Sequence, residues 1–151
     1  FKVLMHRYSR QDDIIVGTPT ANRNQPELEK LIAFFVNPVV FRTDLSEDPA
    51  FNDYLKTVRK VALGAFAHQD APFERLVEEL RPTRDLSYNP IYQVSFTQKM
   101  EPALMQLEGT TSTPMEFDNG TARFDLLAEL WEADGGVSGR FEYDTDLFDK
   151  S

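Results

Sequence analysis

Cysteine is absent from this sequence of 151 residues. Its absence excludes disulfide bonds, thiolate nucleophiles and zinc sites built on cysteine. Histidine is nearly absent as well, since only His6 and His68 are present. Neither histidine stands at a spacing that is typical of metal ligands. The sequence therefore predicts no metal site.

Positive charge is scarce too. Sixteen lysines and arginines face 25 aspartates and glutamates, which gives a formal net charge of −9 at pH 7. Nucleic acids and anionic membranes require basic surface, so neither is an expected partner. The sequence has no apolar run long enough to span a bilayer and no signal peptide, so it predicts neither membrane insertion nor secretion. A reducing, cytoplasmic location agrees with the lack of cysteine.

The composition is typical of a folded globular chain. Hydrophobic residues make up 41% of the sequence, which is enough to form a core and argues against disorder. Twelve residues are phenylalanine, so we expect aromatic packing in that core. The length fits one domain.

Helical and strand patterns alternate along the chain. Apolar residues at spacings of three and four predict helices, and alternating or β-branched runs bounded by Gly, Pro and Asn predict strands. Together they predict a mixed α/β structure with helices packed on a sheet. The predicted elements are a helix starting at Phe1, a strand at 14–16, a short helix from Pro26, a strand at 34–45, a helix at 48–67, a helix after Asp70, a strand at 91–98 and a hairpin at 124–143.

Two of these elements carry more specific predictions. Pro38 cannot donate a hydrogen bond to a ladder, so its strand should be an edge strand or contain a bulge. Asp48 should cap the helix that follows it. Phe51 and Leu55 should begin an apolar stripe that continues along the buried face of that helix to Ala65.

The stretch HQDAPFE, residues 68–74, places an imidazole, an amide and a carboxylate at a predicted helix entry. A catalytic imidazole needs a group to deprotonate and usually a group that orients it. Polar side chains at helix entries more often satisfy free backbone groups. We therefore interpret His68, Gln69 and Asp70 as residues that set the angle between two helices. His6 lies among charged residues and is interpreted as a solvated or interface histidine.

Asn37 and a row on a later strand are the candidates for a binding role. Asn37 alternates with apolar residues, so a strand would place its amide on an apolar face, where it needs hydrogen-bond partners. Two interpretations remain open, a structural bond to nearby backbone and a group aimed into a cleft. Gln93, Ser95 and Thr97 share one face of the strand at 91–98. That row is either a solvated face or the lining of a substrate channel.

Several segments together resemble the condensation domains of nonribosomal peptide synthetases. LIAFFVNPVVFR resembles the family motif IGxFVNTxxxR, HQDAPFE resembles (H/N)QDxPFE, and RDLSYNPIYQVSF resembles RDxSRNPLFQVxF. GTPTANR and EYDTDLFD also fit, and the order and spacing agree from about Asp12 to Asp149. Three motifs in the family's order make this resemblance highly specific.

The resemblance implies one lobe of a two-lobed enzyme with a chloramphenicol-acetyltransferase-like fold, an α/β two-layer sandwich with helices on a mixed sheet. In this family, donor and acceptor peptidyl carrier domains deliver thioesters on phosphopantetheine arms to a tunnel between the lobes. There the acyl group passes to an amine and a peptide bond forms. The implied partners are these carrier domains, the N-terminal lobe and an adjacent adenylation domain, in a multidomain synthetase of secondary metabolites such as antibiotics.

The family's catalytic motif, HHxxxDG, belongs to the first lobe and is absent here. We therefore interpret residues 1–151 as the C-terminal lobe, truncated at both ends, with no catalytic residue of its own and inactive alone. The alternative is a non-catalytic module that docks a carrier protein through basic residues such as Arg81 and Arg84. A small trimeric acyltransferase is disfavoured because the sequence lacks an HxxxD pair.

The resemblance also implies residue roles. Asn37, at the Asn of FVN, is expected to line the substrate tunnel. We expect three further residues to line the tunnel, namely Gln93, Ser95 and Thr97. This expectation rests only on the alternation of side chains along the strand. The other motif residues are expected to be architectural; they are His68, Gln69, Asp70, Pro72, Phe73 and Glu74 in one motif, and Arg84, Asp85, Ser87, Asn89 and Pro90 in the other.

Overall fold

A computed structural model describes residues 1–83, 85, 87–100, 108–113, 115, 117, 119–133 and 135–149. Arg84, one of the residues predicted to be architectural, and Asp134, within the predicted hairpin, lie outside the described residues. The chain forms two compact units, Phe1–Ser95 and Phe96–Ser151. None of the helices in the described part of the chain is long and apolar enough to cross a bilayer.

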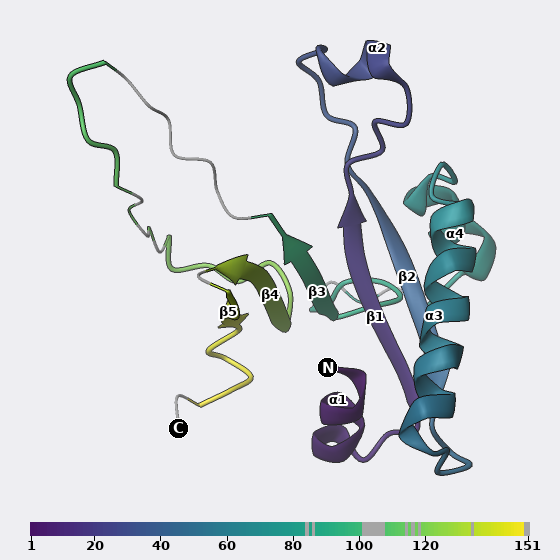
Figure 1. Cartoon of the computed structure of the whole chain (residues 1–151). Coiled ribbons are helices and arrows are strands. Elements are labelled where there is room, and N and C mark those ends of the chain that lie inside the picture. The colour runs from purple at the N-terminus through teal and green to yellow at the C-terminus, as the bar shows by residue number, and fades with distance from the viewer. Residues whose placement is uncertain are drawn as a thin grey trace. The chain divides into compact units, whose positions relative to one another are not determined.

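The first unit is built on a long antiparallel strand pair (Figure 1). The strands β1 (Asp13–Thr20) and β2 (Asn37–Asp44) pair along their whole length, from Asp13 opposite Asp44 to Thr20 opposite Asn37. The helices of this unit are α1 (Lys2–Ser9), α2 (Pro26–Glu29), α3 (Phe51–Ala67) and α4 (Phe73–Leu80). The helices α3 and α4 pack against β2, and α1 packs against β1.

The second unit contains the predicted hairpin. Its strands β4 (Leu126–Ala133) and β5 (Gly136–Tyr143) pair antiparallel from end to end. The strand β3 (Val94–Lys99) runs across the boundary between the units and pairs parallel with β1 at Gly17 and Ser95. The hydrogen-bonded order of the strands is β2-β1-β3-β4-β5. This mixed sheet with helices confirms the predicted α/β class, and β2 at its edge confirms the prediction made from Pro38.

The predicted end of the first strand and the predicted start of the long helix are both wrong. The strand β1 continues through Gly17 and Pro19 because it pairs with β2 along that length. The long helix begins at Phe51 after Ala50, and Asp48 lies before it with a left-handed φ of 47°. Ala50 therefore occupies the N-cap position in place of Asp48, and no side chain caps the helix.

The predicted buried stripe of α3 is also wrong at its start. Phe51 and Leu55 are 66% and 54% exposed, whereas Tyr54 between them is 4% exposed. The Tyr54 hydroxyl is 2.9 Å from Oγ1 of Thr43 on β2. The side chain that α3 buries at its start is therefore a tyrosine bonded to the sheet, in place of the predicted Phe51 and Leu55.

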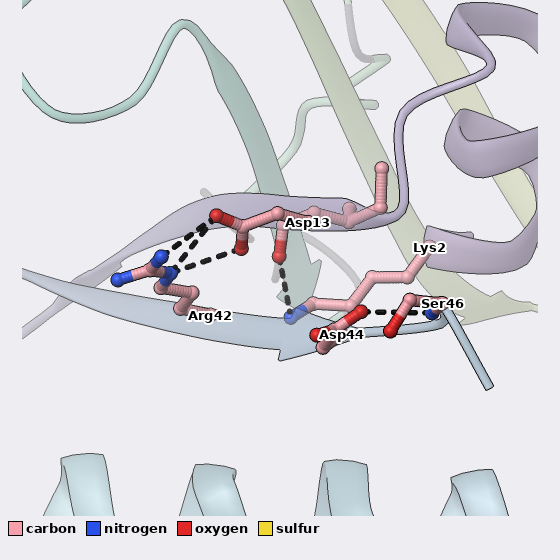
Figure 2. Close-up of polar contacts among 6 residues, drawn as sticks. Lys2, Asp13, Arg42, Asp44 and Ser46 are labelled. Atoms are coloured by element: carbon pink, nitrogen blue, oxygen red, sulfur yellow. Dashed lines mark hydrogen bonds and ion pairs between the residues drawn. The ribbon is translucent and has the colours of Figure 1, made fainter.

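Lys2 anchors α1 to the strand pair. Its ammonium nitrogen lies 2.8 Å from the Phe41 carbonyl oxygen, 3.0 Å from Oγ1 of Thr43 and 3.4 Å from the Ile14 carbonyl oxygen. Figure 2 shows this side chain reaching from α1 to the strands. The residue is 9% exposed, and burial lowers the pKa of Lys2 to about 8, although the Asp13 carboxylate acts in the opposite direction.

An exposed ion pair lies beside Lys2 (Figure 2). Arg42 on β2 donates from Nε to Oδ1 of Asp13 at 2.9 Å and from Nη2 to Oδ2 at 2.8 Å. Two parallel bonds give this pair a defined geometry across β1 and β2. Because both side chains are exposed, we assign the pair only a small contribution to stability.

Gly17 is required where β1 meets β3. The ring of Tyr92, which is 5% exposed, lies against the Cα of Gly17, and a Cβ there would overlap the ring. We expect Gly17→Ala to lower the free energy of unfolding by about 1–2 kcal/mol, because a buried ring must move to admit the methyl group. Urea denaturation would measure this change.

Gly64 provides the matched control. It lies inside α3, and nothing stands within 4 Å of where its Cβ would be. Gly64→Ala is expected to raise the free energy of unfolding by about 0.5–1 kcal/mol, since alanine is the better helix former. Equal effects of the two substitutions would contradict the assigned contact between Gly17 and Tyr92.

Candidate functional site

Asn37 is the first residue of β2 and is 8% exposed. Its Nδ2 donates to the Gln69 carbonyl oxygen at 2.7 Å and to the Ala71 carbonyl oxygen at 2.8 Å. Its Oδ1 accepts from the Phe73 backbone N–H at 3.1 Å. The amide of Asn37 therefore binds the HQDAPFE segment at three points.

The HQDAPFE segment forms the corner between α3 and α4. His68 follows the last residue of α3, and its Nδ1 donates to the Gly64 carbonyl oxygen at 2.9 Å. Asp70 accepts from Nδ2 of Asn24 at 2.7 Å. In the part of the chain that the structure describes, no carboxylate is bonded to His68. The segment therefore forms a corner between two helices, but Asp70 does not cap the helix that follows it, since it bonds the Asn24 side chain. The architectural role of the motif stays a prediction.

The end of this motif packs on aromatic surface. The rings of Phe73 and Tyr92 meet edge to face with centroids 5.7 Å apart. Pro72 precedes the helix in an extended conformation, and Glu74 is exposed in its first turn. The contact of Phe73 places the start of α4 against the residues that lead into β3.

Of the RDLSYNP segment, the structure describes Asp85 and residues 87–90. Asp85 accepts at Oδ1 from the backbone N–H of Ser87 at 2.8 Å and from its hydroxyl at 2.7 Å, and these bonds hold the pKa of Asp85 below its usual value. The Asn89 carbonyl oxygen accepts from Nε2 of Gln93 at 2.7 Å, and the Pro90 carbonyl oxygen accepts from the Tyr92 N–H at 2.9 Å. Residues 89–93 are therefore tied together by short-range bonds just before β3 begins.

The strand β3 begins at Val94, so the prediction that Gln93 lies on it is wrong, and Gln93 directly precedes it. The three residues of the predicted row are largely withdrawn from solvent. Ser95 is fully buried, and its hydroxyl donates to the Gly17 carbonyl oxygen at 3.3 Å. Gln93 and Thr97 are half-buried. The structure therefore does not show a solvated face here. A role in lining a tunnel stays a prediction for Asn37, Gln93, Ser95 and Thr97.

A buried carboxylate in the second unit was missed in the sequence. Glu129 on β4 is 6% exposed and is bonded by the ammonium of Lys99 and by Nε of Arg140, the latter at 2.6 Å. Burial raises the pKa of Glu129, but the bonds from the two cations outweigh burial and hold it below its usual value. The hairpin register, with Glu129 opposite Arg140, is the signal that would have found this pair.

A shallow hollow of about 300 Å³ lies at the end of α4, lined by Val77, Glu78, Arg81 and Pro82. Arg81 has a left-handed φ of 45° and ends the helix. Within the described residues there is no group of three histidine, cysteine or acidic side chains that would hold a metal ion. Nor do these residues include a histidine paired with both a nucleophile and a buried carboxylate. The imidazole–carboxylate pair that the described residues do contain, His6 and Asp12 at 3.4 Å, is partly exposed, with 31% and 54% of the two side chains accessible.

Comparisons with known proteins agree with the motifs. Over residues 1–151 the chain matches the family model described as "Condensation domain". It is 49% identical over 154 residues to one of the linear gramicidin synthase proteins of Brevibacillus parabrevis, a match that covers 100% of this chain and 3% of that protein. It is 47% identical over 150 residues to malpinin synthetase of Mortierella alpina, covering 99% of this chain and 2% of that protein.

A solved structure shows the same fold. The X-domain from teicoplanin biosynthesis is 30% identical, with a TM-score of 0.85 over 98% of this chain and 35% of that chain. The X-domain has also been solved in a complex with OxyB, where it is 31% identical to this chain with a TM-score of 0.81. The chain thus spans about a third of this related domain and a few per cent of the curated synthetases that it matches.

Proposed function

This chain belongs to the condensation-domain family of nonribosomal peptide synthetases, and from that premise we propose that it is the C-terminal lobe of such a domain. In this role it forms one wall of the tunnel in which a carrier-bound aminoacyl amine attacks an upstream carrier-bound thioester. The observation that carries the proposal is the family match over the whole chain, combined with the absence of HHxxxDG from its sequence.

The chemistry of amide formation explains why a second lobe is needed. The amine nitrogen bonds to the thioester carbonyl carbon, the C–S bond breaks, and the thiol of the donor's arm leaves. A proton must leave the amine nitrogen during this exchange, which is a task for a general base. Nδ1 of His68 donates to the Gly64 carbonyl oxygen, which leaves Nε2 as the ring atom that could accept a proton. The residue is exposed, however, and among the described residues no carboxylate is bonded to it. Nδ1 of His6 lies 2.9 Å from the Gln11 carbonyl oxygen at the surface. We therefore assign the base to the first lobe.

What this lobe contributes is positioning. Holding an amine beside a thioester in reactive geometry removes much of the entropic part of the barrier, and two walls are needed to do so. Asn37, Gln93, Ser95 and Thr97 are the residues that we propose for this wall. The proposed partners are the N-terminal lobe, the donor and acceptor carrier domains with their phosphopantetheine arms, and an adenylation domain, all in the cytoplasm.

A second candidate function is a non-catalytic module that docks a carrier protein. Two observations favour it. Arg81 borders the hollow at the end of α4, and the related X-domain has been solved in a complex with another protein, OxyB. This candidate shares the fold with the first and differs from it in having no role in amide formation.

Enlarging a wall residue tests the tunnel directly. In a condensation domain completed by a first lobe, we expect Thr97→Trp to lower the rate of amide formation by about tenfold or more, because the indole would occupy space needed by the substrates. The measurement is the yield of condensed product on the acceptor carrier against time, by mass spectrometry of the intact protein.

Gln98→Trp is the matched control. Gln98 is the next residue of β3, is exposed, and points to the opposite face of the strand. The control is expected to retain the rate of the unaltered domain. A similar loss of rate in both variants, or no loss in either, would contradict the placement of Thr97 in the wall.

A further inference from the structure

We infer that Asn37 is a positioning residue that caps α4 from a distant segment and closes the corner between α3 and α4. In this role its amide serves the protein backbone, and Asn37 supports the proposed wall by holding the adjoining corner in place. The inference deepens the wall proposed above, but it depends only on hydrogen bonds within the chain. It therefore stands or falls separately from the proposed function.

The start of α4 lacks a local cap. The first backbone N–H groups of a helix have no partner within the helix, and a neighbouring Ser, Thr, Asp or Asn usually supplies one. Here the residue before the helix is Pro72, and no side chain there makes a capping bond. Asp70, the nearest carboxylate upstream, accepts from Asn24 instead. Oδ1 of Asn37, 36 positions upstream of Phe73, accepts the Phe73 N–H and takes over the task.

The Nδ2 group of Asn37 binds the corner between α3 and α4. Both bonds from Nδ2, to Gln69 and Ala71, end on carbonyl oxygens of the corner. A side-chain amide satisfies all three partners, because its nitrogen donates two hydrogens and its oxygen accepts one. A carboxylate in this place would turn acceptor atoms toward two carbonyl oxygens, and a hydroxyl would have at most one hydrogen to donate.

Further bonds join this corner to both strands of the first unit. The Thr20 hydroxyl, at the end of β1, donates to the Asn37 carbonyl oxygen at 2.8 Å. The Asn24–Asp70 bond adds a second, exposed tie at 2.7 Å. Asn37 is thus bonded through its main chain to β1 and through its side chain to the corner.

The corner leads on to the proposed wall. Once α4 begins at Phe73, the Phe73 ring packs on Tyr92, and Tyr92 lies on Gly17 beside the pairing with Ser95. Asn37 is therefore connected to β3 through a chain of packed groups. We expect its loss to loosen the corner first and the start of β3 next.

Hydrogen exchange of the full chain tests the inference without any substrate. In Asn37→Ala, we expect the amides of residues 71–76 to exchange at least about tenfold faster, because the bonds that hold this corner are removed. Mass spectrometry of peptides from this region gives the rates, and peptides from the β4–β5 hairpin serve as an internal reference. Asn24→Ala, which removes only the exposed tie to Asp70, is expected to change the same rates by less than about threefold.

A second variant decides the question if Asn37→Ala does not fold. In Asn37→Asp, the ionised carboxylate faces the carbonyl oxygens of Gln69 and Ala71, whereas the neutral carboxyl can donate one bond and accept another. Protection of residues 71–76, corrected for the intrinsic pH dependence of exchange, should therefore recover as the pH falls from 7.5 to about 4.5.

Wild-type protection of residues 71–76 in Asn37→Ala would overturn the inference. So would an Asn37→Asp variant whose protection does not recover in acid. Faster exchange confined to this corner, together with recovery in acid, would support it. A failure of the tunnel proposal would alter neither result, because both are measured on the chain without carrier domains.

Discussion

Supplied with donor and acceptor thioesters on their carrier domains, this chain by itself is expected to form no amide above the uncatalysed rate. Adding a first lobe that carries HHxxxDG is expected to raise the rate by about a hundredfold or more, which is the usual contribution of a positioned general base. The measurement is product on the acceptor carrier, read by mass spectrometry at fixed times with each lobe alone and with both together.

The physical reason lies in the two histidines. Nδ1 of His68 donates to a carbonyl oxygen of α3, which leaves Nε2 as the possible proton acceptor, but the residue is exposed and no carboxylate is bonded to it among the described residues. His6 does lie 3.4 Å from Asp12, but this pair is at the surface of the chain. In the described part of the chain, the hollow at the end of α4 is lined by neither histidine. The added lobe should supply the base, and this chain should supply the second wall.

Two controls give the result its meaning. An added lobe with both motif histidines changed to alanine is expected to restore nothing, and the unaltered lobe without this chain should also be inactive. Amide formation by the chain alone would overturn the proposed division of labour. If the chain binds a carrier domain but never supports condensation with the added lobe, the docking module becomes the better proposal.

The elements that could be predicted are those whose signals are local. Alternating residues and Gly135-Gly136 predict the hairpin, which the structure places at β4 and β5. Pro38 indicates an edge strand because the missing N–H is a property of that residue alone, and β2 lies at the edge. Such features need no knowledge of the partner element.

The face of α3 could not be predicted in the same way. Its 17 residues carry apolar side chains on more than one side, so the hydropathy pattern alone does not select the buried one. The selection comes from the Tyr54 hydroxyl at Thr43, a bond between two elements. A hydropathy scale counts tyrosine as only partly apolar. It also gives no information about the Thr43 hydroxyl on β2, which is the partner of Tyr54.

Asn37 illustrates the same limit within the candidate site. Strand alternation correctly indicates that its amide is turned inward, since the residue is 8% exposed. The sequence leaves open whether the amide meets backbone or a cleft, because its partners at Gln69, Ala71 and Phe73 lie more than thirty positions away. That its motif and HQDAPFE form one structural unit becomes visible only when both segments are placed in space.

Alkaline pH is expected to stabilise the fold through Lys2. The pKa of this ammonium falls from 10.5 in the unfolded chain to about 8 in the folded one, because burial disfavours the charged form more than Asp13 supports it. Between these two values the unfolded chain binds more protons than the folded one, so the free energy of unfolding rises with pH. The full difference corresponds to about 3 kcal/mol as an upper value.

The neutral amine fits its surroundings, which gives this rise a structural basis. It can donate two bonds, to the carbonyl oxygens of Phe41 and Ile14, and it can accept one from the Thr43 hydroxyl, which is itself bonded to Tyr54. No buried partner is therefore left without a hydrogen bond when the proton leaves.

Comparison with Lys2→Met isolates this contribution from other groups that titrate in alkali. The difference in the free energy of unfolding, wild type minus Lys2→Met, is expected to shift in favour of the wild type by about 2–3 kcal/mol between pH 7.5 and 10.5. Lys56→Met is the control, since it removes an ammonium whose side chain is 78% exposed, and its difference should be similar at each pH. Urea denaturation at four pH values measures both. A flat or falling difference for Lys2→Met would mean that the ammonium is hydrated in the folded chain, and α1 would then be held to the strands by apolar contacts alone.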